Sequence, residues 1–180
     1  QRLERGKGLD AEQRENVRTI TRSGTHLLSM INDILDMSKI EAGRAELATG
    51  PFDLLETLRG VEEMFSLRAR EKGIVLLVDV GADVPRYVTS DEGKLRQVVV
   101  NLVGNAVKFT AAGGVTLRVR SRPEPLDETR LDFEVEDSGV GIEPREIEKL
   151  FQPFVQTASG VSSQEGTGLG LPIKIGRAHV

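Results

Sequence analysis

The chain holds two short clusters of glycine, residues 137–141 (DSGVG) and residues 166–170 (GTGLG), with a third element upstream at residues 101–110 (NLVGNAVKFT). Glycine has no Cβ atom, so its backbone can approach a phosphate closely, and successive amide N–H groups or a helix N-terminus then bind the anion. A single Gly-x-Gly occurs in many ordinary turns. Three such elements in this order predict a phosphate-binding site and require a fold that brings them together.

The three elements resemble the ATP-binding region of sensor histidine kinases, in the superfamily that includes DNA gyrase and MutL-type mismatch-repair proteins. Residues 101–110 resemble the N box of that family, residues 137–141 its G1 box, residues 151–154 (FQPF) its F box and residues 166–170 its G2 box. Residues 27–43 resemble the second helix of the dimerisation domain in hybrid-type kinases. The resemblance identifies a family and leaves the sensory pathway open.

The resemblance extends from about residue 11 to Ile173 and implies an α+β fold. The expected architecture is a two-layer α/β sandwich of the Bergerat ATP-binding type, truncated at its C-terminus and preceded by a long dimerisation helix. Residues 1–48 would form part of the dimerisation and phosphotransfer region, without the helix that carries the acceptor histidine. Residues 49–173 would form the ATP-binding domain, incomplete at its C-terminus. Residues 174–180 depart from the family pattern and are expected to be a non-native tail.

An apolar stripe runs along residues 10–43, where apolar side chains recur at steps of three and four. This spacing predicts one long helix, with Gly43 at its end. Such a helix needs a surface on which to bury its stripe. The pattern leaves two possibilities open, packing against the rest of the same domain or against a partner helix. The resemblance favours a partner helix in a homodimeric four-helix bundle.

Beyond a break at residues 49–51 (TGP), the pattern predicts shorter elements. Helices are expected at residues 53–72 and 91–108, strands at residues 74–80, 87–89, 115–120 and 130–136, and a polar hairpin loop at residues 122–128. Asp53 suits the N-cap of the first of these helices and Gly73 its end. Residues 155–165 are rich in Ser, Gln and Gly and have no regular pattern, which is the composition expected of a lid.

Three polar residues, Asn101, Asn105 and Lys108, share one face of the helix predicted at residues 91–108, because they are spaced by four and by three. By themselves they describe an ordinary helix surface. An amide oxygen is also a suitable ligand for Mg²⁺, which binds few protein groups and several phosphate oxygens. The resemblance makes these three the catalytic residues, with Asn105 as the metal ligand and Lys108 in contact with a phosphate of ATP.

Asp137 ends a predicted strand and stands just before two glycines. An Asx turn that opens a loop would by itself explain the segment from Asp137 to Gly139. The resemblance instead gives Asp137 the role of accepting a hydrogen bond from the adenine amino group. A buried carboxylate is costly unless it is hydrogen-bonded, which such a role would provide. Gly139 and Gly141 would let the adenine ring lie close to the backbone.

The second glycine cluster would place a helix N-terminus beneath the phosphates of ATP. The residues that the resemblance assigns to nucleotide binding there are Gly166, Thr167, Gly168, Leu169 and Gly170. A loop-to-helix junction without a ligand is the alternative, although each glycine costs about 1 kcal/mol in a helix. Phe151 and Phe154 are expected to be core residues that hold the lid.

Asn101 distinguishes phosphate transfer from hydrolysis. The gyrase and mismatch-repair ATPases carry a glutamate at this position, which activates water as a general base, whereas an asparagine side chain cannot accept a proton at neutral pH. The resemblance therefore favours an ATP-dependent histidine kinase whose phosphate is relayed to the aspartate of a response-regulator receiver domain. A hydrolytic ATPase of the same superfamily and a non-catalytic, ATP-responsive dimerisation scaffold stay open as alternatives.

The chain has two histidines, His26 and His179. Neither lies in the Ser-His-Glu-Leu-Arg type of motif that carries the phosphorylated histidine in this family. His26 falls in the predicted long helix, where we expect a residue of the helix surface. The acceptor histidine is therefore expected outside this chain, which for the chain by itself supports the scaffold alternative.

The amino-acid composition limits the kinds of binding partner and the cellular location that can be expected. The absence of cysteine excludes disulfides, zinc–thiolate sites and thiol catalysis. The formal net charge is −4 and no long basic run occurs, so direct nucleic-acid binding is disfavoured. No apolar stretch approaches the roughly 20 residues that span a bilayer. A cytoplasmic location is expected, with any membrane anchor in segments outside this chain.

Overall fold

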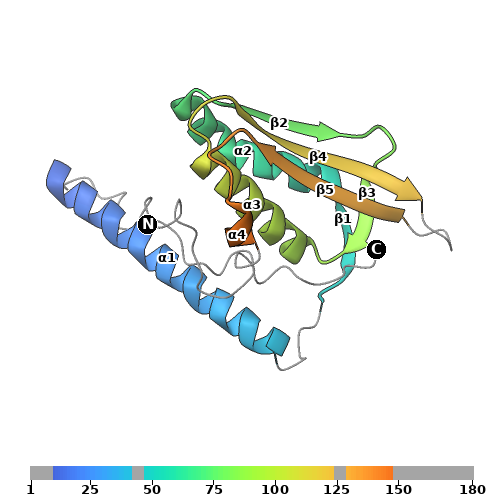
Figure 1. The fold of residues 1–180 in the computed structure, drawn as a ribbon. Coiled ribbons are helices and arrows are strands. Elements are labelled where there is room, and N and C mark those ends of the chain that lie inside the picture. The colour runs from blue at the N-terminus through green and yellow to red at the C-terminus, as the bar shows by residue number, and fades with distance from the viewer. Residues whose placement is uncertain (1–9, 42–46, 124–128, 148–180) are drawn as a thin grey trace. The chain divides into compact units, whose positions relative to one another are not determined.

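The computed structural model describes residues 10–41, 47–123 and 129–147 (Figure 1). The chain divides into two compact units, residues 1–45 and residues 46–180. No helix in the described ranges is long and apolar enough to cross a membrane.

The first unit holds α1 (Ala11–Glu41), which confirms the expected long helix. Its expected end at Gly43 lies outside the described residues. Asp10 caps its start: the Gln13 N–H donates to Asp10 Oδ1 at 2.7 Å, and the Asp10 N–H donates to Gln13 Oε1 at 3.2 Å. This reciprocal pair satisfies two backbone amides that a helix start leaves without partners. Most side chains of the apolar stripe are exposed, namely those of Ile20, Leu27, Leu28, Ile31, Ile34 and Leu35.

The second unit combines short sheets with helices. Its elements in chain order are β1 (Gly50–Asp53), α2 (Leu54–Lys72), β2 (Val75–Val80), β3 (Tyr87–Ser90), α3 (Glu92–Phe109), β4 (Gly114–Pro123), β5 (Thr129–Asp137) and α4 (Pro144–Ile147). β1 pairs with β3 in antiparallel fashion. The other sheet has the order β2-β4-β5, in which β2 is parallel to β4 and β4 antiparallel to β5. The predicted α+β class is confirmed.

Helices α2 and α3 cover one face of the β2-β4-β5 sheet (Figure 1). Side chains alternate along a strand, so Val115, Leu117 and Val119 of β4 point toward the helices and are at most 1 % exposed. The helices contribute further core residues, namely Leu54, Leu58, Val61, Phe65, Ala69, Val99, Val103, Ala106 and Val107. Burial of this apolar surface is the main stabilising term. It also fixes α3, the helix that carries three of the predicted site residues.

Local signals set the ends of both helices. Asp53 Oδ1 accepts the Glu56 N–H at 3.1 Å at the start of α2. Gly73 ends that helix in the left-handed conformation, with φ of 69°. At the start of α3, Asp91 Oδ1 accepts the Lys94 N–H at 2.9 Å. The predicted ends of α2 and α3 fall within one residue of the observed ends.

Two strands differ from the sequence-based expectation. β1 was not predicted, because a four-residue strand that contains Pro51 is recognisable only through its partner, and Pro51 lies opposite Thr89 of β3. The loop expected over residues 122–128 is wrong at its start, since β4 continues to Pro123, which pairs with Thr129. In both cases the strand is defined by a partner that the local pattern does not contain.

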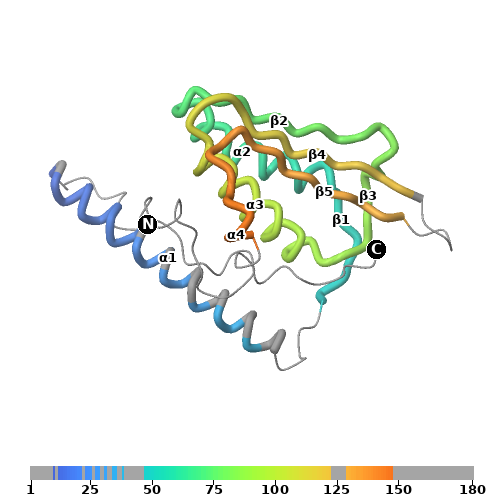
Figure 2. Tube along the Cα trace, viewed as in Figure 1, coloured from blue at the N-terminus to red at the C-terminus, as the bar shows by residue number. Residues whose placement is uncertain are grey.

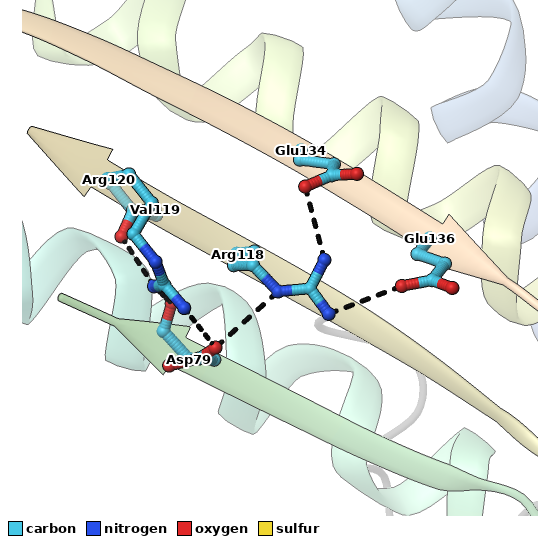
Figure 3. Close-up of polar contacts among 6 residues, drawn as sticks. All are labelled: Asp79, Arg118, Val119, Arg120, Glu134 and Glu136. Carbon is cyan, nitrogen blue, oxygen red and sulfur yellow. Dashed lines mark hydrogen bonds and ion pairs between the residues drawn. The ribbon is translucent and has the colours of Figure 1, made fainter.

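The face of the sheet opposite the helices carries a network of charges (Figure 3). Arg118 of β4 pairs with Glu134 and Glu136 of β5 at 3.1 and 3.2 Å, and with Asp79 of β2 at 3.5 Å. The hydrogen bonds that Arg118 donates to these two glutamates raise its pKa. Arg120 also contacts Asp79, and its hydrogen bond is the main cause that lowers the pKa of this carboxyl. Such cross-strand pairs support the register of the three strands, each by a small amount because they are exposed.

Candidate functional site

Three of the predicted site residues lie along α3. Asn101, Asn105 and Lys108 are all half-buried, and their spacing places them on one face of the helix. Lys108 Nζ lies 4.8 Å from the centre of the Phe109 ring, within the range of a cation–π contact. The C-terminal half of α3 therefore presents two amides and an ammonium group on one side.

The end of α3 is held by a residue that the sequence pattern did not indicate. Lys72, the last residue of α2, donates from Nζ to the carbonyl oxygens of Val107, Lys108 and Thr110 at 2.8, 2.7 and 3.0 Å. The last carbonyls of a helix lack partners within the helix and form the negative end of its dipole. Lys72 both satisfies and neutralises this end. A basic residue directly before Gly73 was the only signal of it in the sequence.

Asp137 is the last residue of β5 and is exposed. Its Oδ1 accepts the Gly139 N–H at 2.8 Å, so the Asx turn that was the alternative interpretation of this segment is formed. The burial expected of this carboxylate is not observed, because Asp137 ends a strand at the edge of the described sheet. One oxygen serves the turn. Within the described residues Oδ2 has no protein partner, so it is available as an acceptor.

The glycines that follow Asp137 have different surroundings. A Cβ atom built on Gly139 would lie 2.8 Å from the Phe109 carbonyl oxygen, so the loop after β5 lies directly against the end of α3. Figure 2 shows the trace passing from β5 toward α3 and α4. Gly141 has φ of +70°, a conformation that favours glycine, and a Cβ there would meet nothing within 4 Å. The position beside Gly141 is therefore open space.

Ser138 ties the same loop to the turn after α3. Its Oγ donates to the Ala112 carbonyl and accepts the Gly114 N–H, both at 2.9 Å, and its own N–H donates to the Gly114 carbonyl at 3.1 Å. Gly113 makes room for this hydroxyl: a Cβ on Gly113 would lie 2.3 Å from Ser138 Oγ. The sequence pattern did not indicate Ser138 as a positioning residue, since its partners lie 24 and 26 positions away.

The C-terminal end of α3 adjoins the loop after β5, and these two segments carry an amide, an ammonium group and a carboxylate. Asn105 offers an amide oxygen of the kind that Mg²⁺ accepts alongside phosphate oxygens. Lys108 offers a cation for a phosphate, and Asp137 offers an acceptor for an amino group. In the described part of the chain, no group of three or more His, Cys, Asp or Glu side chains could hold a metal ion.

Two pockets formed by described residues lie elsewhere in the second unit. A pocket of about 260 Å³ is lined by Phe52, Asp53, Glu56, Thr57, Glu92 and Arg96. A second, of about 140 Å³, is lined by Glu62, Ser66, Ala69, Arg70, Ile74 and Leu76. Neither includes a residue of the C-terminal half of α3 or of the loop after β5.

The other predicted residues lie outside the described ranges. They are Phe151, Phe154, Gly166, Thr167, Gly168, Leu169, Gly170 and His179, together with the lid expected at residues 155–165 and the tail expected at residues 174–180. Their roles stay predictions. His26 lies within α1.

Two family models match the chain. Residues 90–174 match the histidine kinase-, DNA gyrase B-, and HSP90-like ATPase family. Residues 1–43 match the His Kinase A (phospho-acceptor) domain. The first match contains α3, the loop after β5 and the second glycine cluster, and the two together leave only residues 44–89 and 175–180 uncovered.

Individual proteins agree with these matches. The signal transduction histidine-protein kinase BarA of Escherichia coli K12 is 40 % identical over 166 residues, which is 92 % of this chain and 18 % of BarA. The sensory/regulatory protein RpfC of Xanthomonas campestris is 43 % identical over 170 residues, which is 93 % of this chain and 23 % of RpfC. The crystal structure of full-length ShkA in complex with AMPPNP gives a TM-score of 0.71 at 42 % identity, covering 93 % of this chain and 34 % of ShkA. The chain spans about a fifth of the length of these two curated relatives.

Proposed function

Because the chain belongs to the histidine kinase family, we propose that residues 49–173 bind ATP with Mg²⁺ and transfer its γ-phosphate to a histidine, for relay to the aspartate of a response-regulator receiver domain. The observation that carries the proposal is the close approach of Gly139 to the Phe109 carbonyl, 2.8 Å from a Cβ built on that glycine. This contact joins the loop that would bind adenine to the helix that would bind the phosphates. One nucleotide can therefore reach both.

Asp137 is the residue that would select the base. Oδ2 would accept a hydrogen bond from the adenine amino group, and the open space at Gly141 would take the ring. Oδ1 is held by the Gly139 N–H, so the carboxylate is oriented before the nucleotide arrives. Guanine presents an oxygen where adenine has its amino group, and an acceptor facing an acceptor disfavours binding.

Lys108 and Asn105 would act on the triphosphate. Lys108 would contact a phosphate, and Asn105, one helical turn earlier, would supply an amide oxygen to Mg²⁺. When bound, Mg²⁺ neutralises phosphate charge and helps to orient the γ-phosphate for in-line transfer. The backbone amides of residues 166–170, which lie outside the described ranges, would also bind the phosphates.

Asn101 favours transfer over hydrolysis. Its amide lies on the same face of α3 as Asn105 and cannot take a proton from water at neutral pH. The attacking group must then be a nucleophile that needs no base from this helix, and a neutral histidine nitrogen meets that requirement. His26 is not proposed as this nucleophile, and the acceptor would come from a segment outside this chain.

The proposed assembly is a homodimer through α1. Ile20 is 71 % exposed and Leu28 is 64 % exposed on this helix. An apolar stripe of this kind needs a partner helix, and the α1 of a second copy would supply one. We place the catalytic region in the cytoplasm, without direct contact to nucleic acid.

Phosphorylation in trans tests the proposal. The 180-residue chain is incubated with γ-labelled ATP, Mg²⁺ and a dimerisation bundle that carries an acceptor histidine. Acid-labile label on the bundle is expected from the wild type. Asn105→Ala should lower the labelling rate about 10- to 100-fold, the equivalent of one lost contact to a charged group. Ser66→Ala, on α2 and outside the site, should leave the rate unchanged.

The alternatives give different products in the same assay. Free phosphate without label on histidine would contradict the kinase and identify a hydrolytic ATPase. Bound nucleotide with neither product would identify a scaffold. Equal labelling by the wild type and Asn105→Ala would remove Asn105 from the site.

A further inference from the structure

We propose that Lys72 of α2 is a positioning residue of the nucleotide site. It would hold the last turn of α3 in place, and through that turn set the position of Lys108 and of the Phe109 carbonyl. The inference rests on the proposed ATP site and concerns which residue holds the end of α3 in position within that site.

Lys72 uses all three of its N–H donors in this contact. An ammonium group has three N–H donors, and three carbonyl oxygens lie within hydrogen-bond distance of Nζ, at 2.8, 2.7 and 3.0 Å. All three belong to one helix end, that of Val107, Lys108 and Thr110. The partners are 35, 36 and 38 positions from Lys72 in the chain, so the bonds fasten the end of α2 to the end of α3.

Lys72 is itself fixed at its base. Gly73 follows in the left-handed conformation and donates its N–H to the carbonyls of Ala69 and Arg70, which ends α2 at this point. Ala69, in the last turn of the helix, is 2 % exposed and packs in the core. The Lys72 side chain is exposed overall, so its contribution comes from where it directs its donors rather than from burial.

The three bonded carbonyls surround the part of α3 on which the site depends. One is the carbonyl of Lys108 itself. Lys108 and Thr110 are the chain neighbours of Phe109, whose own carbonyl is the atom against which Gly139 packs. A shift of this turn would move the proposed phosphate contact and the proposed base-binding loop together. The positive charge of Lys72 also offsets the negative dipole end of α3, which would otherwise face an anionic nucleotide.

Nucleotide affinity measures this role. The dissociation constant of Mg-AMPPNP is determined by calorimetry on the full chain, at a temperature where circular dichroism shows each variant folded. Lys72→Met keeps an apolar stem and removes the donors, and we expect its dissociation constant to rise about fivefold or more. Lys72→Arg keeps the charge and the N–H donors, in a planar arrangement, and its dissociation constant should stay closer to that of the wild type than that of Lys72→Met does. Arg70→Met removes the same charge from the same last turn of α2 and should change nothing.

A double-mutant cycle shows whether Lys72 acts through the end of α3. In a Lys108→Met background, Lys72→Met should raise the dissociation constant by a smaller factor than it does alone, because the group that it positions is gone. If Lys72→Met raises the dissociation constant by the same factor in the Lys108→Met background as in the wild type, the inference is overturned. So would a Lys72→Met chain that melts at a lower temperature but binds AMPPNP as the wild type does, since that result describes a purely structural lysine. A wild-type chain that binds no AMPPNP is a different failure, which removes the proposed function itself.

Discussion

At the scale of single residues, the position of the loop after β5 depends on one close approach between backbones. A Cβ on Gly139 would meet the Phe109 carbonyl oxygen at 2.8 Å and the carbonyl carbon at 3.1 Å. A backbone carbonyl at the end of a packed helix cannot turn aside as a flexible side chain can. Only glycine therefore allows the loop to touch α3 at this point. This contact explains the glycine at position 139 without reference to any ligand.

Substitution of Gly139 by alanine should separate the loop from α3. We expect Gly139→Ala to lower the free energy of unfolding by about 1–3 kcal/mol, the usual cost of overpacking, as measured by urea denaturation. Gly50→Ala is the matched control, because a Cβ there meets nothing within 4 Å and its φ is not positive. The control should stay within about 0.5 kcal/mol of the wild type. Identical midpoints for the two variants would contradict the close contact.

Residue-level prediction from sequence succeeded where the partners are neighbours in the chain. The Asx turn of Asp137 spans two positions and was among the interpretations of the sequence. Lys72 and Ser138 act on partners that lie 24 to 38 positions away. A side chain that donates across such a distance has no periodic or local signature, so their positioning roles follow only from the fold.

At the scale of elements, the helix ends were predictable because caps are local. Asp53 and Gly73 bracket α2 within the reach of a single turn at each end. The strand β1 was not predictable, because it exists through its pairing with β3, whose residues lie 34 to 40 positions later in the paired register Asp53–Tyr87 to Gly50–Ser90. The same holds for the last residues of β4, which β5 completes as a hairpin.

Acid titration tests the ion pair between Asp53, at the start of α2, and Arg86, which directly precedes β3. Asp53 Oδ1 caps α2, and Oδ2 accepts the Arg86 Nε–H at 2.8 Å. The hydrogen bond from Arg86 is the main cause that lowers the pKa of Asp53 below its ordinary value of 3.8. A lowered folded-state pKa gives stability that is present above the ordinary value and is lost as pH falls through the folded-state pKa. Arg86→Met should therefore make the unfolding free energy fall less steeply with acidification below about pH 4.

The control for this titration is Arg68→Met, which removes an exposed arginine of α2. Its unfolding free energy, from denaturant melts at a series of pH values, should follow the slope of the wild type. Equal slopes for the wild type and Arg86→Met would show that the ion pair does not contribute to folding in solution.

At the scale of the whole molecule, the α+β class that the resemblance implied is correct, and the matching family models are those of the family that the resemblance named. The roles of the glycine clusters stay predictions. The order of helices and strands can be predicted from the hydrophobic periodicity, which is visible in the sequence itself. The meeting of α3 with the loop after β5 is a tertiary property: the sequence named Asn105, Lys108 and Asp137 through the resemblance, and the fold brings their elements together. The dimer expected through α1 is likewise a prediction from an exposed stripe.

The central claim is that α3 and the loop after β5 form one site for ATP with Mg²⁺. Thermal melts of the wild type, Asn105→Ala and Asp137→Asn with and without Mg-ATP test it most directly. A ligand that binds only the folded chain adds about 2.7 kcal/mol at 100 times its dissociation constant. We predict that Mg-ATP raises the melting temperature of the wild type and raises that of both variants clearly less. No shift in the wild type, or the same shift in all three chains, would contradict the claim.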